Sequence, residues 1–161
     1  ALVTGIRHVL NEFDSLEACF YKGSGPEDDT VIPALTFLCR HLDPAASLGH
    51  LLADPRKKSA CKRSHLFLRW MIRQDAVDPG GWDQADPSRL IVPLDTHMHR
   101  AGMLLGFTRR KNPDLAAALE ITRGFRRISP EDPVKYDFSL TRYGIRNELD
   151  SDELEQILKG T

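Results

Sequence analysis

The sequence predicts an all-α protein, and three observations point to that class. Apolar residues recur every three or four positions through most of the chain, as on the buried face of an amphipathic helix. Glycine and proline signals separate these segments at short intervals. No stretch of useful length alternates apolar and polar residues as a strand does. Short connections between many moderate helices are typical of a globular array rather than a long coiled coil.

The helices are expected in the following order. Two segments show the spacing most clearly, with Leu2, Ile6, Val9, Leu10 and Phe13 in the first and Val31, Leu35, Leu38 and Leu42 in the second. Further helices are expected over residues 15–21, 47–53, 60–74, 94–106, 113–127, 132–145 and 151–159. Turn and helix-start signals mark the breaks between them, at residues 23–26, 54–55, 78–81, 86–87, 112–113 and 129–130.

Composition limits the protein's class without naming its function. A chain of 161 residues with 41% hydrophobic content is expected to form one helical domain, residues 1–161, with a sizeable core. The three cysteines Cys19, Cys39 and Cys61 are odd in number and contain no C-x-x-C pair, so neither a zinc site nor a disulfide framework is predicted. A cytoplasmic location fits this cysteine usage, and the sequence shows no apolar run long enough to span a membrane.

Charge is balanced overall but unevenly distributed. The chain has 22 lysines and arginines against 23 acidic residues, so net charge alone does not draw it to nucleic acid. The segment from residue 56 to residue 73, however, contains seven basic residues and no acid. Such a segment is either a phosphate-binding surface or a solvated helix face. The candidates for DNA contacts within it are Arg56, Lys57, Lys58, Arg63 and Arg73.

Asp95 is the most informative single residue. Pro93 disfavours a helical conformation for the residue before it, so a loop is expected to become a helix near this point. An aspartate at a helix N-terminus is held ionised by the first-turn N–H groups and the helix dipole. The position suits an ordinary N-cap, and it equally suits a fixed anion in an active site.

A resemblance to a known superfamily favours the second interpretation. The run Pro93-Leu-Asp-Thr-His-Met-His-Arg100, followed by residues 104–107 (Leu-Leu-Gly-Phe), resembles the signature V-D-T-H-x-x-R-V…R-L-G of the helix-hairpin-helix DNA glycosylases. The aspartate of that signature is the catalytic carboxylate. Residues 67–73, 93–97 and 132–140 together also resemble an uncharacterised bacterial protein family grouped with those enzymes. The resemblance covers about residues 50–146 and implies a hairpin-like basic segment over 46–74 and a catalytic-type helix over 94–106.

The same resemblance selects Lys62. Residues 60–70, Ala-Cys-Lys-Arg-Ser-His-Leu-Phe-Leu-Arg-Trp, are similar to the string G-Y-K-E-A-S-H-F-L-R-N of a glycosylase branch specialised for oxidised guanine. In many members the matching lysine attacks the sugar C1′ of a flipped nucleotide and forms a Schiff base that permits strand cleavage. The resemblance therefore implies catalytic roles for Asp95 and Lys62. A plain phosphate-contacting or solvated lysine is the alternative for Lys62.

The sequence departs from the family pattern in three ways. Lys58 and Ala60 stand where the superfamily's hairpin usually carries glycines, and the interval from Lys62 to Asp95 is longer than usual. The four-cysteine iron–sulfur cluster of some members has no counterpart, so no cofactor is predicted. The chain begins on Ala1 inside a helical pattern, and we expect it to be a fragment that lacks part of the N-terminal region of this fold.

Other candidates have weaker support. Asp95, His97 and His99 form D-x-H-x-H, but His97 and His99 point to different faces of a helix, so no metal site is predicted. His97 and Arg100 are instead expected to face DNA. Trp82 follows a double glycine and either stacks on a base or anchors its loop. By resemblance, the late helix borders the base pocket, which adds Lys135, Tyr136, Asp137 and Ser139.

Three classes of function remain open from the sequence. The first is a DNA glycosylase, with or without abasic-site lyase activity, acting on duplex DNA that has a damaged or abasic site. The second is a DNA-binding module that keeps the fold but not the chemistry, which the missing glycines favour. The third is a protein-interaction domain whose basic face contacts an acidic partner. The sequence identifies neither the base nor the oligomeric state.

Overall fold

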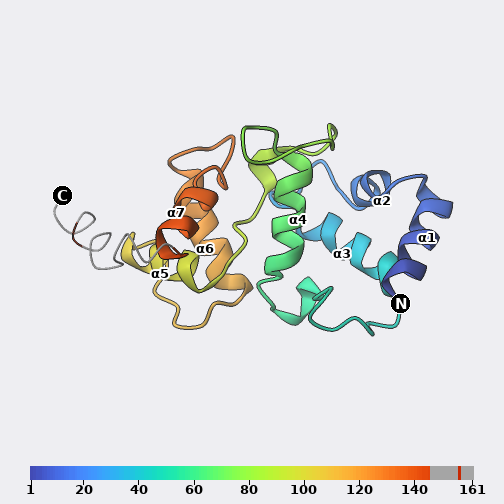
Figure 1. The fold of residues 1–161 in the computed structure, drawn as a ribbon, viewed down its shortest axis with the longest axis horizontal. Coiled ribbons are helices and arrows are strands. Elements are labelled where there is room, and N and C mark those ends of the chain that lie inside the picture. Colours follow the sequence, from blue (N-terminus) through green and yellow to red (C-terminus); the bar gives the residue numbers. More distant parts are fainter. Residues whose placement is uncertain (146–155, 157–161) are drawn as a thin grey trace.

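The computed structural model describes residues 1–145 and residue 156, and over these residues it is all-α (Figure 1). An isolated β-bridge between Gln74 and Pro79 is the one extended pairing in this part of the chain. The predicted fold class is therefore confirmed at the level of an all-helical globular protein. The α-helices are α1 (Leu2–Phe13), α2 (Leu16–Lys22), α3 (Ile32–Leu42), α4 (Lys62–Ile72), α5 (Thr96–Leu104), α6 (Leu115–Arg126) and α7 (Asp137–Ile145), with 3-10 turns η1 (Pro55–Lys57) and η2 (Pro87–Arg89).

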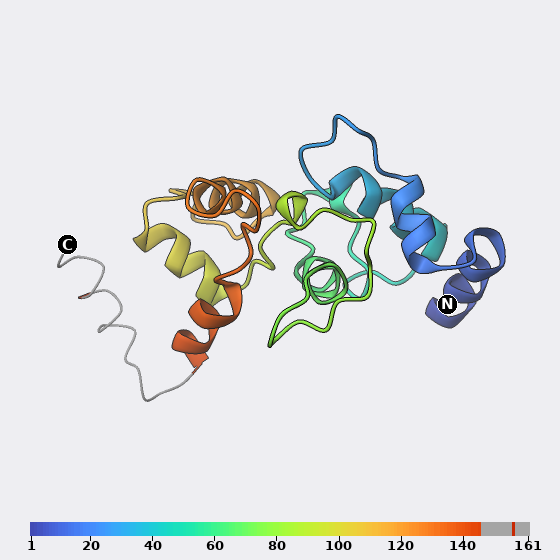
Figure 2. The same ribbon diagram turned by 90° about the horizontal axis from the view of Figure 1, so that it is seen from above.

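The helices form two groups with α4 between them. Helices α1, α2 and α3 pack on one another at one end, and α5 packs against α6 and α7 at the other. Figure 2 shows the same order after a quarter turn, so α4 is central in both views. One continuous apolar core joins the groups, with Leu35 of α3, Leu68 of α4 and Ile121 of α6 all fully or almost fully buried. Side chains at the ends of α4 and α5 are consequently held on a single packed body.

Local sequence signals explain where several helices begin and end. Ser15 caps α2, since its hydroxyl accepts a hydrogen bond from the Ala18 N–H at 2.9 Å. Asp114 caps α6 in the same way through the Ala117 N–H at 2.8 Å. Gly5 permits α1 to lie directly on α3, because a Cβ at this position would be only 1.8 Å from the Leu42 carbonyl oxygen.

Two predicted helices differ from the structure. Residues 47–53 form turns, because the Asp43 carboxylate accepts hydrogen bonds from the Ser47 N–H at 3.0 Å and the Leu48 N–H at 2.7 Å. The hairpin-like segment 46–74 thus contains the 3-10 turn η1 and α4, and its first arm is not an α-helix. The helix predicted over 132–145 begins only at Asp137, after turns around Pro133. The helix predicted over 151–159 lies outside the described residues, except for residue 156.

Neither the cysteines nor the helix lengths indicate a particular function. All three cysteines are buried free thiols. Within the described residues, no helix has both the length and the apolar character needed to cross a membrane.

His65 lies fully buried in α4 and gives the fold a pH dependence. Neither ring nitrogen has a hydrogen-bond partner among the described residues, and burial lowers the pKa of His65 from 6.5 to about 4. Unfolded His65 binds a proton below about pH 6.5, whereas folded His65 does so only near pH 4. Its contribution to stability is therefore complete above pH 6.5 and falls as the pH is lowered through this window, by about 3 kcal/mol.

We expect His65→Leu to remove this acid sensitivity. The measurement is the difference in free energy of unfolding between wild type and variant, taken from urea titrations between pH 7 and pH 4, in which other titrating groups largely cancel. The difference should shift by about 3 kcal/mol in favour of the variant as the pH falls. A pH-independent difference would contradict the prediction.

Candidate functional site

Lys62 and Asp95 lie together where two helices begin. Lys62 is the first residue of α4, and Asp95 is the N-cap of α5. The Lys62 Nζ is 3.2 Å from Asp95 Oδ2, while Asp95 Oδ1 accepts a hydrogen bond from the Met98 N–H at 2.8 Å. The carboxylate is therefore both a cap and an ion-pair partner. The side chains of Lys62 and Asp95 are 48% and 17% exposed, so a ligand can reach the pair.

The chain fixes Asp95 from the N-terminal side. Residues 90–94 pass through the core without regular secondary structure, and Leu90, Ile91 and Val92 are completely buried. The Val92 N–H donates to Thr122 Oγ1 of α6 at 3.1 Å, which satisfies a backbone group that is far from water. This buried segment ends in Pro93 and Leu94, and it thereby fixes the position of the Asp95 carboxylate at the surface.

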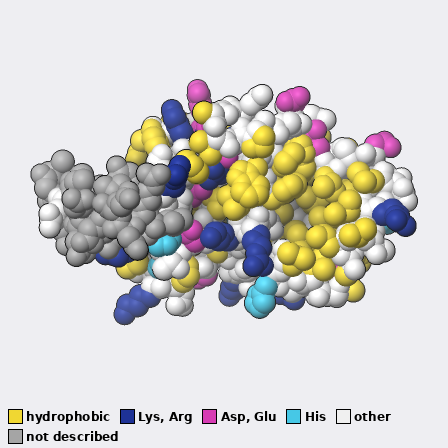
Figure 3. Space-filling model, viewed as in Figure 1, with side chains coloured by type: hydrophobic (Ala, Val, Ile, Leu, Met, Phe, Trp, Pro, Cys, Tyr) yellow, Lys and Arg dark blue, Asp and Glu magenta, His cyan; other side chains and the backbone are white. Residues whose placement is uncertain are grey.

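The Lys62–Asp95 pair borders a cleft of about 680 Å³ between α4, the start of α5, and α7. Trp70 and Phe138 offer aromatic surface to it, and Trp70 is 44% exposed. Figure 3 shows this side of the molecule, with hydrophobic side chains spread over the α1–α4 region and lysine and arginine side chains at their edge toward α7. The remaining lining residues are Leu66, Phe67, Arg69, Met71, Val77, Pro79, Pro93, Asp137, Thr141 and Arg142.

A buried network of charges supports one wall of this cleft. Arg69 donates to Asp78 through Nε at 3.1 Å and Nη2 at 2.8 Å, and it also binds Asp137 through Nη1. Arg73 pairs with Asp78, with Asp132 at 2.9 Å and with Asp75 at 2.8 Å. Arg69 and Asp78 are 3% and 0% exposed. The network therefore joins α4, the loop after it and the start of α7.

Asp137 is the acidic member of this network that lines the cleft. Burial raises the pKa of Asp137 from 3.8 to about 6, Arg69 opposes the rise, and the negative charges of Asp95 and Asp78 add to it. Asp95 and Asp137 line the same cleft, so both carboxyl groups can act on one bound ligand. The cleft thus holds one amine and two carboxyl groups in different environments, an arrangement that can divide nucleophilic and acid–base roles.

The basic residues predicted to bind DNA have different surroundings. Lys57 and Lys58 are exposed, and Arg63 is exposed while donating to the His50 carbonyl at 2.9 Å. Arg56 is exposed and forms a 2.6 Å ion pair with Asp54. Lys58 has a left-handed backbone with φ of 62°, a conformation that favours glycine and that fits the missing hairpin glycine.

Arg73 requires a correction. It was predicted to contact phosphates, but it is only 6% exposed and its guanidinium is occupied by Asp75, Asp78 and Asp132. The basic run misled because sequence alone does not show that Arg73, the C-cap of α4, is buried four residues after Arg69. The exposed part of the basic surface, at the start of α4, consists of Arg56, Lys57, Lys58, Lys62 and Arg63.

Trp82 also differs from the expectation of a base-stacking residue. It is 7% exposed and packs against Phe20, with ring centroids 5.3 Å apart, and edge-on against Phe67, with centroids 5.6 Å apart. This packing matches the alternative that Trp82 anchors its loop. Trp82, the residue after the double glycine, is thus part of the core. Its backbone N–H donates to the Met71 carbonyl, which holds the loop against α4.

The remaining predicted residues do not line the cleft. His97 and Arg100 are exposed on α5, and Lys135, Tyr136 and Ser139 are exposed near the start of α7 without lining the cleft. His99 is 8% exposed, and its Nε2 donates to the Arg110 carbonyl at 2.8 Å. The structure therefore brings together Lys62, Asp95 and Asp137 among the predicted site residues.

Sequence reasoning missed several residues of the site. The Arg69–Asp78 pair and the cleft residues Phe138 and Arg142 were not proposed. One signal was available, since Arg69 of α4 and Arg73 at its C-cap are four residues apart and directly follow the buried residues Leu68 and Ile72. Two arginines at that spacing, followed by Asp75 and Asp78, indicate a buried ion-pair network.

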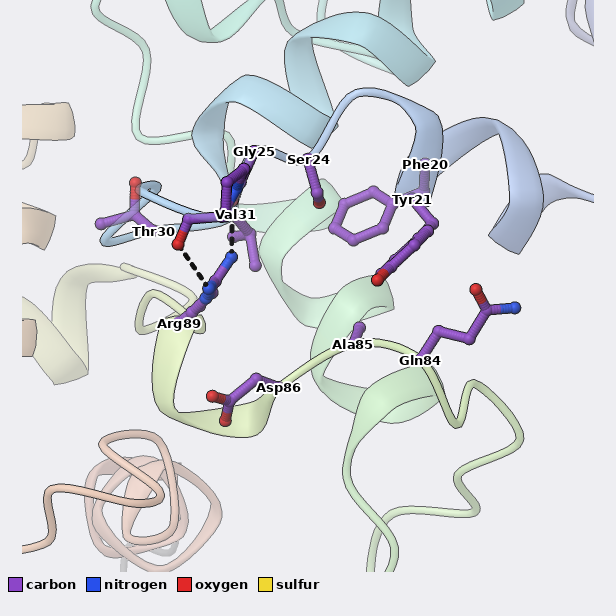
Figure 4. A pocket seen from close by; sticks show the side chains of 11 residues that line it. Phe20, Tyr21, Ser24, Gly25, Thr30, Val31, Gln84, Ala85, Asp86 and Arg89 are labelled. Atoms are coloured by element: carbon purple, nitrogen blue, oxygen red, sulfur yellow. Dashed lines mark hydrogen bonds between the residues drawn. The ribbon is translucent and has the colours of Figure 1, made fainter.

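A second pocket, of about 260 Å³, lies away from this cleft between the loop after α2 and residues 84–89 (Figure 4). Its charged groups already hold the backbone: Arg89 donates to the Gly25 carbonyl at 3.0 Å, and Asp86 accepts from the Ser88 N–H at 2.8 Å. None of the predicted site residues lines it. The charged side chains of this pocket therefore stabilise the loops that form it.

Comparisons add a family without an activity. No group of three or more histidine, cysteine or acidic residues in the described part of the chain is arranged to hold a metal ion. Comparison with curated proteins found no match, and comparison with solved structures found none either. A family model described as "Protein of unknown function (DUF2400)" matches residues 1–146, which agrees with the expectation of an uncharacterised family. The chain belongs to this family, DUF2400.

Proposed function

We propose that this protein is a DNA glycosylase with abasic-site lyase activity. The observation that carries the proposal is the 3.2 Å pairing of Lys62 with Asp95 at the border of a cleft. These two residues come from sequence positions 33 apart, and the resemblance to glycosylases selected both of them independently of the fold. Their convergence supplies an amine and a carboxylate within reach of one bound group.

The chemistry that this pair supports is attack on a sugar carbon. Once deprotonated, the Lys62 amine can attack C1′ of a nucleotide that has been flipped from the duplex, while the bond to the base breaks. Asp95 stabilises the positive charge that develops on the sugar and accepts the proton that the amine releases. The imine that forms between Lys62 and C1′ then permits cleavage of the DNA strand.

Exposed cations close to Lys62 in the chain support the binding of DNA phosphates. Lys57, Lys58 and Arg63 are exposed beside Lys62, at the start of α4. Helix α4 begins at Lys62, so the positive end of its dipole lies at the same place. These groups support binding of phosphates without reading sequence, as expected for an enzyme that searches duplex DNA for damage.

The test of the proposal uses wild-type protein and two kinds of duplex oligonucleotide. A panel of single damaged bases reports base release, and a duplex with one abasic site reports a covalent complex after borohydride reduction. We expect release of at least one base and a trapped complex. Salt-sensitive DNA binding with neither reaction would instead show a binding module, and loss of binding even at low salt would indicate a protein-interaction domain.

Asp95→Asn is expected to lower the rate of base release about 10²- to 10³-fold while DNA affinity changes little, because the variant removes one fixed charge from the transition state. Asparagine is as good an N-cap as aspartate, so α5 should remain folded. The matched control is Asp114→Asn, which makes the same change at the N-cap of α6, away from the cleft. Equal rates for Asp95→Asn and wild type in single-turnover assays would exclude a catalytic Asp95.

A further inference from the structure

Asp137 is a buried carboxyl group with one oxygen left unused. It is 4% exposed, and its Oδ2 accepts a hydrogen bond from Arg69. Its Oδ1 is buried and has no hydrogen-bond partner among the described residues. Buried polar atoms are nearly always paired, so an unpaired oxygen in the wall of a cleft indicates a group that a ligand completes.

The charges around Asp137 come from every side of the cleft. Arg69 of α4 binds it, Asp78 shares Arg69 with it, and Asp95 acts on it from the start of α5. Lys62 and Arg142 line the same cleft. Burial raises the pKa of Asp137 to about 6, with Arg69 opposing the rise and Asp95 and Asp78 adding to it, so the group can hold a proton that a typical aspartate would have lost.

The cleft surfaces favour a planar neutral group over a cation. Trp70 and Phe138 present aromatic surface, and apolar side chains dominate the rest of the lining. Three cations face the space, namely Lys62, Arg69 and Arg142, and Arg142 already lies over the Phe138 ring at 5.0 Å. The two carboxyl groups of the lining, Asp95 and Asp137, offset at most two of these three cations, so the lining keeps a net positive charge that disfavours a positively charged base. A neutral base can stack and accept a hydrogen bond.

We propose that Asp137 is the general acid that protonates the departing base, and that the cleft takes a neutral damaged base rather than a positively charged alkylated one. This inference rests on the proposed glycosylase function. It assigns a separate role to each carboxyl group: Asp95 stabilises the sugar, and Asp137 serves the leaving group.

The C1′–N bond to the base breaks, and its electron pair goes to the base. The proton on Asp137 moves to a ring nitrogen or exocyclic oxygen of that base, which leaves as a neutral molecule. The Lys62 amine forms the new bond to C1′ and gives up a proton to Asp95. A base that already carries a positive charge needs no such proton, because it departs neutral by itself.

The test compares two reactions of Asp137→Asn. Release of oxidised guanine or deaminated adenine from duplex DNA needs the acid, whereas borohydride trapping on an abasic duplex has no base to protonate. We expect single-turnover base release to fall about 10²-fold and trapping to stay within about twofold of wild type. The control Asp132→Asn alters the same ionic network through Arg73 but does not line the cleft, and both of its reactions should match wild type.

A pH profile of the wild-type protein provides a second readout that does not depend on the variant folding. The ratio of the base-release rate to the trapping rate should fall about tenfold per pH unit above about pH 6, the pKa of Asp137, because both reactions need the deprotonated Lys62 amine and only base release needs the Asp137 proton. Equal base release by Asp137→Asn and wild type, or parallel pH profiles, would overturn the inference and leave the glycosylase function standing. Release of a cationic methylated guanine in preference to every neutral lesion would overturn the substrate class.

A wild-type protein that neither releases a base nor traps on an abasic site would remove the proposed function, and the role of Asp137 with it. Failure of the Asp137 role and failure of the glycosylase function are therefore distinguishable, because trapping on an abasic site depends on Lys62 and not on Asp137.

Discussion

Lys62→Arg is expected to lose covalent trapping on abasic DNA completely while keeping its affinity for DNA. Arginine retains the positive charge and can still pair with Asp95, but a guanidinium is always protonated in proteins and forms no reducible imine with C1′. The variant therefore separates the nucleophile from the cation. Lys62→Gln should lose trapping as well and should bind DNA more weakly, because it also removes the charge.

The matched control for this prediction is Lys57→Arg. Lys57 is an exposed lysine in the neighbouring 3-10 turn η1, and it does not line the cleft. Borohydride trapping, read as a shifted band on a denaturing gel, should be unchanged in this control. A trap that persists in Lys62→Arg and disappears in Lys57→Arg would move the nucleophile to the surface lysine and would contradict the assignment based on the Lys62–Asp95 pair.

Local sequence predicted most of the fold because its helices are encoded locally. The spacing of Val31, Leu35 and Leu38 is enough to place α3, and Asp95 and Asp114 mark the starts of α5 and α6 as N-caps. The segment 47–53 was predicted wrongly because a nearby side chain competes with the helix for its backbone N–H groups. Asp43, before the segment, captures two of its backbone N–H groups and turns the chain instead.

The sequence predicted only those site residues that belong to a recognisable motif. Lys62 and Asp95 were found through resemblance, and their contact follows from the way α4 and the buried segment 90–94 meet. Arg73 was misjudged because charge is visible in sequence but burial is not, and a buried arginine needs partners from distant segments such as Asp132. Asp137 was named as a weak candidate, yet its unpaired oxygen follows from tertiary packing alone.

Removal of Asp78 is expected to have the largest effect on stability. Asp78 is completely buried and binds both Arg69 and Arg73, so Asp78→Ala leaves two buried guanidinium groups short of a counter-charge. Breaking a buried pair by removing one partner costs about 3–5 kcal/mol, since the stranded charge remains out of water. That loss is a large fraction of the 5–15 kcal/mol that typically separates folded from unfolded protein.

The measurement is the free energy of unfolding from urea titrations, with Glu12→Ala as the control. Glu12 forms an exposed pair with His8 on α1, and its removal should cost less than about 1 kcal/mol. The network that stabilises the fold also positions the site, because Arg69 links Asp78 to Asp137 in the cleft wall. An Asp78→Ala variant as stable as the control would mean that the network does not hold α4 to α7, and that Asp137 is positioned by helix packing alone.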